Sequence, residues 1–376
     1  MTRTAKLLSD LIALPSVNPA FLPPRHPHAG EGRVAEFLAS VAAAAGLDVE
    51  FQKVFPQRPN LLVRLQPAGS IRRTILLAPH LDTVNVASDA QFVPTRRTGR
   101  LYGRGACDTK GCVAAMLSAL CDLAKSRPRP LETAIVFAGL IDEENGQTGS
   151  RALVASGLKA SLAIVGEPTR MQVVTAHKGS LWLRLETRGK AAHGAAPHLG
   201  RNAVHEMARV VELLQTDYAE HLRKRRHPLL GCATVSVGTI AGGSQTNVVP
   251  DRCSITVDRR SLPGETEVSV RRELATFLRA RDLGARISSA KLAPCLPLET
   301  NPQLTLVRQF LRSVGQARVV GVHYFCDASV LADGGIPSVV FGPGDIAQAH
   351  TTDEWISLAQ LERGRELLLR FLKSLP

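Results

Sequence analysis

The sequence predicts an α/β protein with a mostly parallel sheet flanked by helices, into which a smaller α+β domain is inserted. In the first half, short apolar runs rich in β-branched residues alternate with helical stretches, a pattern typical of parallel sheets. Between about residues 179 and 293 the pattern changes to alternating strands, which indicates an antiparallel sheet. At 376 residues the chain is also longer than one hydrophobic core usually holds. We therefore expect one domain to comprise residues 1–178 and 294–376, and an inserted domain to comprise residues 179–293.

The first domain contains four predicted buried strands and one well-defined predicted helix. The helix spans Lys110–Lys125, is rich in Ala, Leu and Met, and is entered through Asp108-Thr109. The strands are short apolar runs, each followed by polar or glycine-containing loops. They are Thr74–Ala78, Thr133–Leu140, Leu162–Val165 and Ser338–Phe341.

The predicted insertion contains three strands, separated by two helices. The helices are expected at Asn202–Gln215 and Glu265–Ala280. The strands, which alternate apolar and polar residues, are Ser180–Thr187, Thr234–Gly238 and Arg252–Arg260.

Composition indicates a globular protein of a reducing compartment. No apolar run approaches the roughly 18–20 residues that a membrane span needs. The segment Met1–Leu14 mixes charged residues with leucines, which predicts an amphipathic helix and not a signal peptide. The seven cysteines are scattered and form no C-x-x-C pair, which favours free thiols. We therefore expect a cytoplasmic protein with no membrane partner.

The net charge of +13 does not by itself indicate nucleic-acid binding. The densest basic run, His221–His227, has no interleaved aromatic residues. Phosphate contacts alone give weak and salt-sensitive affinity without recognition. We expect no nucleic-acid partner.

Histidines and carboxylates gather just beyond the C-terminal ends of the predicted buried strands. In open α/β sheets this edge is where ligands bind. A further aspartate follows Gly103-Arg-Gly105 at the start of the predicted helix, at the same edge. The residues concerned are His80, Asp82, Asp108, Glu143, Glu144, Glu167 and His350.

Each of these residues has an ordinary structural interpretation when taken alone. Asp108 could cap the helix that follows it, and Glu167 before a proline could be a turn residue. Their occurrence together at one edge argues against that interpretation. So many carboxylates in one cleft repel one another by several kcal/mol, and bound cations would remove the repulsion.

Two histidines with three or more carboxylates and no cysteine ligand suit zinc, cobalt or manganese better than magnesium or calcium. Two ions about 3.5–4 Å apart, bridged by one carboxylate, would account for the number of ligands. Of the neighbouring Glu143 and Glu144, one can bind metal while the other acts as general base. Asp82 is placed to accept the second N–H of His80. The predicted chemistry is hydrolysis, in which metal ions lower the pKa of a bridging water that then attacks a carbonyl.

The sequence resembles a family of dinuclear zinc amidohydrolases and peptidases. The family includes acetylornithine deacetylase, succinyl-diaminopimelate desuccinylase, aminoacylase and carboxypeptidase G. The resemblance covers essentially the whole chain, and the combination of motifs is specific. The motifs are Pro79-His-Leu-Asp-Thr83, Gly103-Arg-Gly-Ala-Cys-Asp-Thr-Lys-Gly111, Asp142-Glu-Glu144, Gly166-Glu-Pro-Thr169, Ala176-His-Lys-Gly179 and Ala349-His350.

This resemblance implies a fold of the zinc-peptidase type and specific roles for the clustered residues. His80, Asp108 and Glu167 would hold one zinc ion, and Asp108, Glu144 and His350 the other, with Asp108 as the bridge. Glu143 would be the general base and Asp82 the aspartate behind the first histidine. Residues 1–178 and 294–376 would form the catalytic domain, and residues 179–293 a lid and dimerisation domain.

The inserted domain carries three further residues that the resemblance links to the substrate. His193 would polarise the scissile carbonyl from the other subunit of a homodimer. Asn247 and Arg260 match positions for the substrate carboxylate and the reacting carbonyl. Arg259 competes with Arg260 for this role, because neighbouring strand residues face opposite ways.

The motifs most resemble acetylornithine deacetylase, which suggests an N-acyl amino acid substrate and a role in arginine biosynthesis. Asp327, however, stands where that enzyme carries a glutamate. The segment around Asn247 looks more like the desuccinylase and carboxypeptidase branches. Desuccinylase and dipeptidase or carboxypeptidase activities therefore remain alternatives, as does a non-catalytic binding protein of the same fold.

Overall fold

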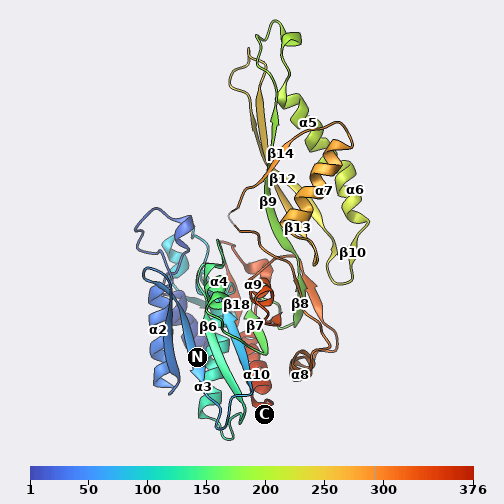
Figure 1. Ribbon diagram of the computed structural model, residues 1–376. Coiled ribbons are helices and arrows are strands. Elements are labelled where there is room, and N and C mark those ends of the chain that lie inside the picture. The colour runs from blue at the N-terminus through green and yellow to red at the C-terminus, as the bar shows by residue number, and fades with distance from the viewer. Residues whose placement is uncertain (292) are drawn as a thin grey trace. The chain divides into compact units, whose positions relative to one another are not determined.

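The computed structural model describes residues 1–291 and 293–376, which form two compact units (Figure 1). The first unit comprises residues 1–175, 300–320 and 326–376. The second comprises residues 176–299 and 321–325, and so extends a few residues beyond the predicted insertion at each end. It does so because Ala176 and His177 pair antiparallel with Glu299 and Leu298.

A large sheet forms the centre of the first unit. Its strand order runs β1-β2-β6-β3-β7-β17-β8. The neighbours β6, β3, β7 and β17 are mutually parallel, whereas β1 and β2 are antiparallel additions at one side. The strands are β1 (Asp48–Phe55), β2 (Arg58–Leu65), β3 (Arg73–Pro79), β6 (Thr133–Gly139), β7 (Leu162–Gly166), β8 (Val174–His177) and β17 (Ser338–Val340). The predicted mostly parallel α/β architecture is confirmed.

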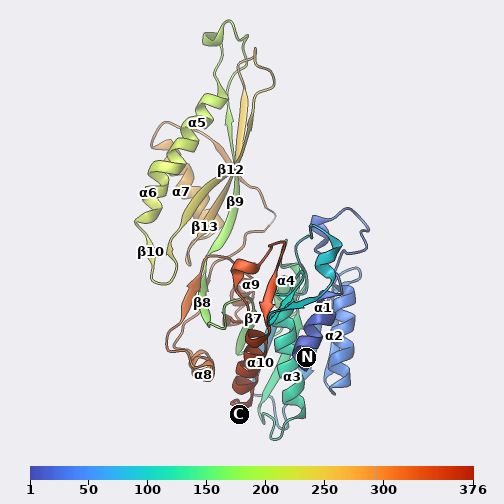
Figure 2. The same cartoon turned by 180° about the vertical axis from the view of Figure 1, so that it is seen from behind.

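Both faces of the parallel strands are buried, which explains their continuous apolar sequences. In β3, Ile75 and Leu77 belong to the core that is shared with α1, α3 and α10, and the alternate residues Leu76 and Ala78 are also buried. Figure 2 shows α1, α3 and α10 along that face of the sheet. The helices of this unit are α1 (Arg3–Ile12), α2 (Gly32–Ala44), α3 (Lys110–Lys125), α4 (Thr148–Ala155), α8 (Thr305–Val314), α9 (Ala328–Asp333) and α10 (Leu358–Lys373).

A small antiparallel sheet links two loops of the first unit. In this sheet β18 (Trp355–Ser357) pairs with β5 (Arg100–Tyr102), which pairs with β4 (Thr95–Arg97). The pairing places the segment after His350 beside the segment before Asp108.

The second unit is a four-stranded antiparallel sheet with helices on one face. The strand order is β12-β13-β9-β14. Inward-facing residues such as Leu183 and Val257 pack with Met207 and Leu274 of the helices. The elements are β9 (Gly179–Arg188), β12 (Thr234–Gly242), β13 (Arg252–Ser261), β14 (Arg286–Ser289), α5 (Ala203–Leu213), α6 (Ala219–Arg223), α7 (Glu267–Arg279) and two short pairs, β10 (Arg226–His227) with β11 (Gly231–Cys232) and β15 (Leu298–Glu299) with β8.

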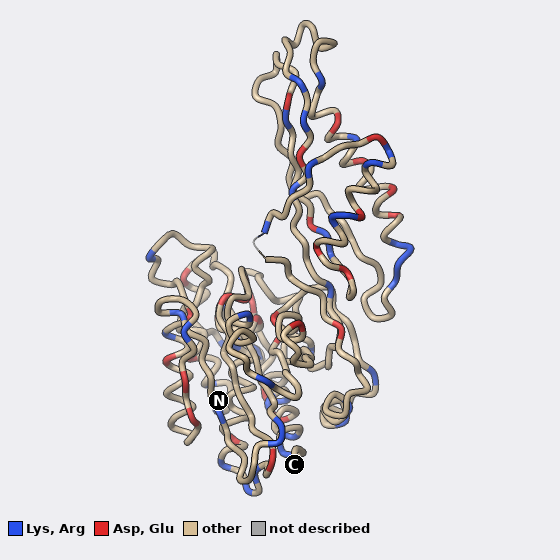
Figure 3. Tube along the Cα trace, viewed as in Figure 1, with Lys and Arg blue, Asp and Glu red and all other residues tan. Residues whose placement is uncertain are grey.

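Charged residues are distributed over both units. Figure 3 shows Lys and Arg positions interspersed with Asp and Glu along the whole trace. Among the helices that the structure describes, none is long and apolar enough to cross a membrane.

Candidate metal centre

The ends of three adjacent parallel strands bring the predicted residues together. His80 directly follows β3, and Glu167 directly follows β7. Beyond β6, Leu81 donates its backbone N–H to the carbonyl of Leu140 at 2.7 Å, so the segment leading to Glu143 continues beside His80. Because the three strands are parallel, their following residues lie at one edge of the sheet.

The Asp108 carboxylate lies between two imidazoles. Its Oδ1 is 3.1 Å from Nε2 of His80, and its Oδ2 is 3.4 Å from Nε2 of His350. Glu144 Oε1 is 3.2 Å from the same His350 nitrogen, and Glu167 Oε1 is 3.9 Å from the His80 nitrogen. Potential ligand atoms of His80, Asp108 and Glu144 lie within 4.8 Å of one another. All five predicted ligands therefore belong to one cluster.

Burial and crowding shift the pKa values in this cluster. Burial would lower the pKa of His80, but its hydrogen bonds with Asp108 and Asp82 outweigh that effect and raise it well above the usual value. Hydrogen bonds with Asp108 and Glu144 raise the pKa of His350 to about 10. Burial raises the pKa of the Glu143, Glu144 and Glu167 carboxyls. The cluster is thus a set of desolvated carboxylates that positive charge would stabilise.

The donor atoms fit divalent metal ions. His80 Nδ1 lies 3.0 Å from the backbone carbonyl of Asp82 and 3.3 Å from its carboxylate. Because both neighbours are acceptors, Nδ1 carries a proton, so Nε2 is the nitrogen that would bind a metal ion. Asp108 offers one oxygen toward each imidazole, as a bridging carboxylate requires. Nitrogen and oxygen donors without sulfur suit zinc, cobalt and manganese.

The chain matches the peptidase family M20/M25/M40 over residues 76–374. This match includes every residue of the cluster. The chain belongs to this family. It is therefore an M20 hydrolase, and the predicted family and enzyme class are confirmed.

Relatives of this M20 hydrolase include several named acetylornithine deacetylase. The protein of that name from Myxococcus xanthus is 35% identical over 87% of this chain and 88% of its own length. One from Proteus mirabilis (strain HI4320) is 29% identical over 98% of this chain and 96% of its own.

Solved structures share the fold over nearly the whole chain. The M20 family metallo-carboxypeptidase Sso-CP2 from Sulfolobus solfataricus matches with a TM-score of 0.77, 19% identity and 99% coverage of both chains. A tripeptidase from Staphylococcus aureus matches with a TM-score of 0.78 and 22% identity, covering 99% of this chain and 97% of its own. Bacillus subtilis YXEP, described as a dinuclear metal-binding peptidase, matches with a TM-score of 0.72 and 13% identity, covering 98% and 96%.

Asp82 organises the loop that carries the two adjacent glutamates of the M20 site. Its carboxylate accepts the backbone N–H groups of Glu143 and Glu144, each at 3.1 Å. Asn18 donates to the same carboxylate at 2.7 Å and to Asp142 at 3.0 Å. Asn18 lies far from the motifs in sequence, and no sequence signal identified it.

A buried ion-pair network supports this loop from behind. Arg58 donates from Nε to the fully buried Glu31 at 2.6 Å, and its Nη2 lies 3.5 Å from Asp142. Glu31 also accepts the backbone N–H of Asp142 at 3.1 Å. Asp142 itself adopts a left-handed φ of 66°, which these contacts hold in place. Glu31 and Arg58 lie on a helix cap and a strand that show no motif, so sequence reasoning missed them.

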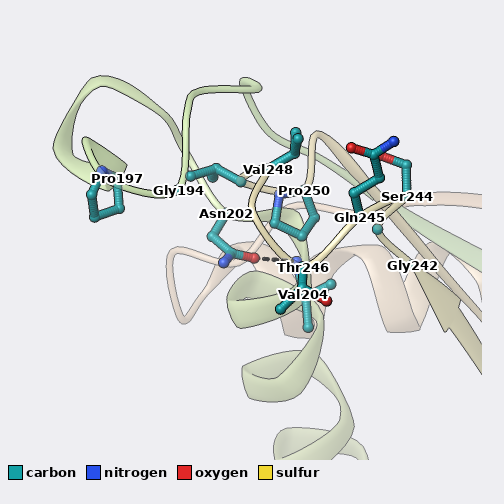
Figure 4. Close-up of a pocket in the computed structure, with 12 residues that line it drawn as sticks. Gly194, Pro197, Asn202, Val204, Gly242, Ser244, Gln245, Thr246, Val248 and Pro250 are labelled. Carbon is teal, nitrogen blue, oxygen red and sulfur yellow. Dashed lines mark hydrogen bonds between the residues drawn. The ribbon is translucent and has the colours of Figure 1, made fainter.

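The second unit holds the three residues that the sequence linked to the substrate. His193 and Asn247 are exposed and lie on neighbouring segments, since Gly194 donates its backbone N–H to the carbonyl of Asn247 at 2.7 Å. A pocket of about 580 Å³ adjoins these segments. Figure 4 shows this pocket, including Asn202, which caps α5 by accepting the backbone N–H of Val204.

Arg259 and Arg260 face opposite sides of β13. Arg259 is fully buried and donates to Glu265 at 2.8 Å and to the Tyr218 hydroxyl at 3.4 Å. Arg260 is only partly buried and pairs with Asp258 at 3.0 Å. Its guanidinium also lies 5.9 Å from the centre of the Phe325 ring. Arg259 therefore already has partners in the core of the second unit, and Arg260 is the more exposed of the two arginines.

Proposed function

We propose that this M20 hydrolase removes the acyl group from an N-acyl amino acid, with N-acetylornithine as the leading substrate. The observation that carries the proposal is the Asp108 carboxylate, which presents one oxygen to His80 and the other to His350. This arrangement supports a site for two divalent ions, with zinc first and cobalt or manganese as alternatives. The relatives named acetylornithine deacetylase support the choice of substrate.

In this proposal His80, Asp108 and Glu167 hold one ion, and Asp108, Glu144 and His350 hold the other. When bound, the ions supply a Lewis acid that polarises the scissile carbonyl and acidifies water. Glu143 is the general base. Burial raises the pKa of the Glu143 carboxyl, which makes its carboxylate a stronger base than an exposed glutamate.

The surrounding residues would orient the metal ligands and the general base, and Glu143 would transfer a proton. Asp82 orients His80 and fixes the backbone at Glu143, so the base keeps its position relative to the ligands. The proton that Glu143 accepts can be delivered to the leaving amine. Asn247 and Arg260 would bind the substrate carboxylate and carbonyl, and His193 would act from the partner subunit of a homodimer, with the second unit as lid.

The cysteines are scattered along the sequence and form no C-x-x-C pair, which supports a reducing cytoplasmic location. A role in arginine biosynthesis follows from the proposed substrate.

Amide hydrolysis by purified, zinc-loaded protein tests the proposal. The panel should contain N-acetylornithine, N-acetylcitrulline, N-succinyl-diaminopimelate, other N-acyl amino acids and dipeptides, each with and without a chelator. Chelator-sensitive turnover of an N-acyl amino acid would support it, and N-acetylornithine as the best substrate would establish the branch. Dipeptide cleavage with rejection of every N-acyl compound would replace it with a peptidase function. Absence of bound metal and of turnover would favour a non-catalytic protein.

A further inference from the structure

Glu354 is a buried carboxylate that the proposed reaction does not use. It is 1% exposed and lies four residues after His350, at the entry to β18. Its side chain points to the opposite loop of the cluster, which carries Asp108. Glu354 therefore connects the segments that bear two of the proposed ligands.

Three backbone N–H groups of the Asp108 loop converge on the Glu354 carboxylate. Oε1 accepts from Cys107 at 2.8 Å and from Asp108 at 2.9 Å. Oε2 accepts from Gly105 at 2.9 Å and from the Arg104 guanidinium at 2.8 Å. All four donors are hydrogen-bonded by this single side chain, and each is buried.

The main chain strengthens the same connection. Gly103 donates its backbone N–H to the carbonyl of Glu354 at 3.0 Å, so both the backbone and the side chain of Glu354 bind this loop. Gly105 has a left-handed φ of 79°, and a Cβ there would lie 2.9 Å from Lys110 Cδ and 3.0 Å from Thr83 Cγ2. The loop is therefore tightly packed at Gly105 and is joined to Glu354 through both its backbone and its side chain.

We propose that Glu354 is a positioning residue that holds the Asp108 carboxylate between His80 and His350. The backbone N–H of Asp108 is bound directly by Glu354, and its two carboxylate oxygens then reach the two imidazoles. The inference rests on the proposed two-metal site. In this inference Glu354 keeps the Asp108 carboxylate in the position from which it can contact both ions at once.

Glu354→Gln is the discriminating variant because it preserves the size of the side chain. Its amide oxygen can accept one pair of hydrogen bonds, but its NH₂ group then faces two donors. Glu354→Ala removes all four acceptor contacts. Glu362→Gln is the matched control, since Glu362 also pairs with an arginine, Arg365 at 3.1 Å, but lies on α10 outside the loop.

Metal-free proteins should be titrated with Zn²⁺ against a chromophoric chelator, and Mn²⁺-loaded samples examined by electron paramagnetic resonance for spin coupling. We expect the wild type and Glu362→Gln to bind two ions with a coupled Mn²⁺ pair. Glu354→Gln should bind one of the two ions at least about tenfold more weakly and should lose the spin coupling of the Mn²⁺ pair. Its kcat should fall by a larger factor than the factor by which its KM changes. Circular dichroism and a melting curve would establish that the variant is folded.

If Glu354 had a purely structural role, its substitution would lower the melting temperature. The two Zn²⁺ affinities and the spin coupling of the Mn²⁺ pair would stay unchanged in the folded protein. That result in Glu354→Gln would overturn the inference while leaving the two-metal site intact. Failure of the wild type to bind two ions would instead overturn the proposed function, and this inference with it. If Glu354→Ala does not fold, the Glu354→Gln measurements still decide the question.

Discussion

Oδ1 of Asp82 lies 3.3 Å from Nδ1 of His80, and both side chains are almost completely buried. The aspartate therefore sets the tautomer of the histidine and leaves Nε2 free to face Asp108. Because the Asp82 carboxylate also accepts backbone N–H groups of the following loop, it orients a proposed ligand and the proposed base together.

We expect Asp82→Ala to weaken metal binding and turnover by roughly 10–100-fold each, the usual cost of losing a carboxylate behind a histidine ligand. Metal affinity by chelator competition and kcat on the best substrate would measure both. Asp89→Ala, at an exposed position of the short 3-10 helix Asp89–Phe92 in the same unit, is the control and should change neither. Wild-type affinity in a folded Asp82→Ala protein would show that His80 needs no such partner.

Substitutions of the neighbouring Glu143 and Glu144 should distinguish the general base from a metal ligand. Glu143→Ala should retain two ions and lose roughly 10²–10⁴-fold in kcat, because it removes a proton acceptor and not a ligand. Glu144→Ala should lose one ion, since Glu144 lies 3.2 Å from His350. Elemental analysis with kinetics measures both outcomes, and loss of metal from Glu143→Ala with retention in Glu144→Ala would reverse the two assignments.

His193 provides a test of the proposed homodimer. If it acts in the partner's site, His193→Ala and Glu143→Ala homodimers are each inactive, but mixed dimers contain one site with both residues intact. Mixing after partial dissociation should then restore up to about a quarter of the wild-type activity, assuming random exchange with one competent site in each mixed dimer. Proven subunit exchange without recovery would mean that each site is completed within one chain.

His177 should make the stability of the second unit depend on pH. Burial lowers the pKa of His177 to about 4, and its Nε2 has no hydrogen-bond partner among the described residues. The unfolded chain binds a proton near pH 6.5, so between pH 6.5 and 4 the unfolded state binds more protons than the folded state. The contribution of His177 to the free energy of unfolding is therefore fully present above pH 6.5. It falls, by up to about 3 kcal/mol, as the pH drops toward 4.

His177→Phe removes this proton linkage. Urea unfolding of metal-free protein between pH 4 and 7.5 should show the wild type losing stability relative to the variant as the pH falls. Trp182 fluorescence reports the second unit once Trp355, in the first unit, is replaced by Phe throughout. His205→Gln, at an exposed position on α5, should show a constant difference from the wild type. Parallel curves for His177→Phe and the wild type would contradict the prediction.

Local sequence patterns predicted much of the fold of the first unit. The helix at Lys110–Lys125 has the predicted bounds. The strand that begins at Thr133 ends within one residue of its predicted end. Apolar periodicity is a local property, and it determines which faces of a strand or helix can be buried. His80 was among the candidate ligands because it lies just beyond a predicted strand, whereas Asp108 precedes the predicted helix and His350 lies in the loop after the last predicted strand.

Other features depended on contacts between segments distant in sequence. Glu31, Asn18 and Glu354 support the cluster through partners that lie 27 to 250 residues away in sequence. The distinction between Arg259 and Arg260 likewise required the helices that cover one face of β13. Burial of a charged side chain is decided by what packs over it, which a linear pattern does not contain.

The sequence by itself determined the α/β class, the family and the set of candidate metal ligands, because these follow from local periodicity and from motifs of fixed spacing. Only the tertiary structure decided that Asn18 and Glu31 support the loop of Glu143 and Glu144, and that Glu354 binds the loop of Asp108. Those relationships arise where parallel strands end side by side and a C-terminal segment folds back upon them. Their geometry is a property of packing across the whole chain and not of any one segment.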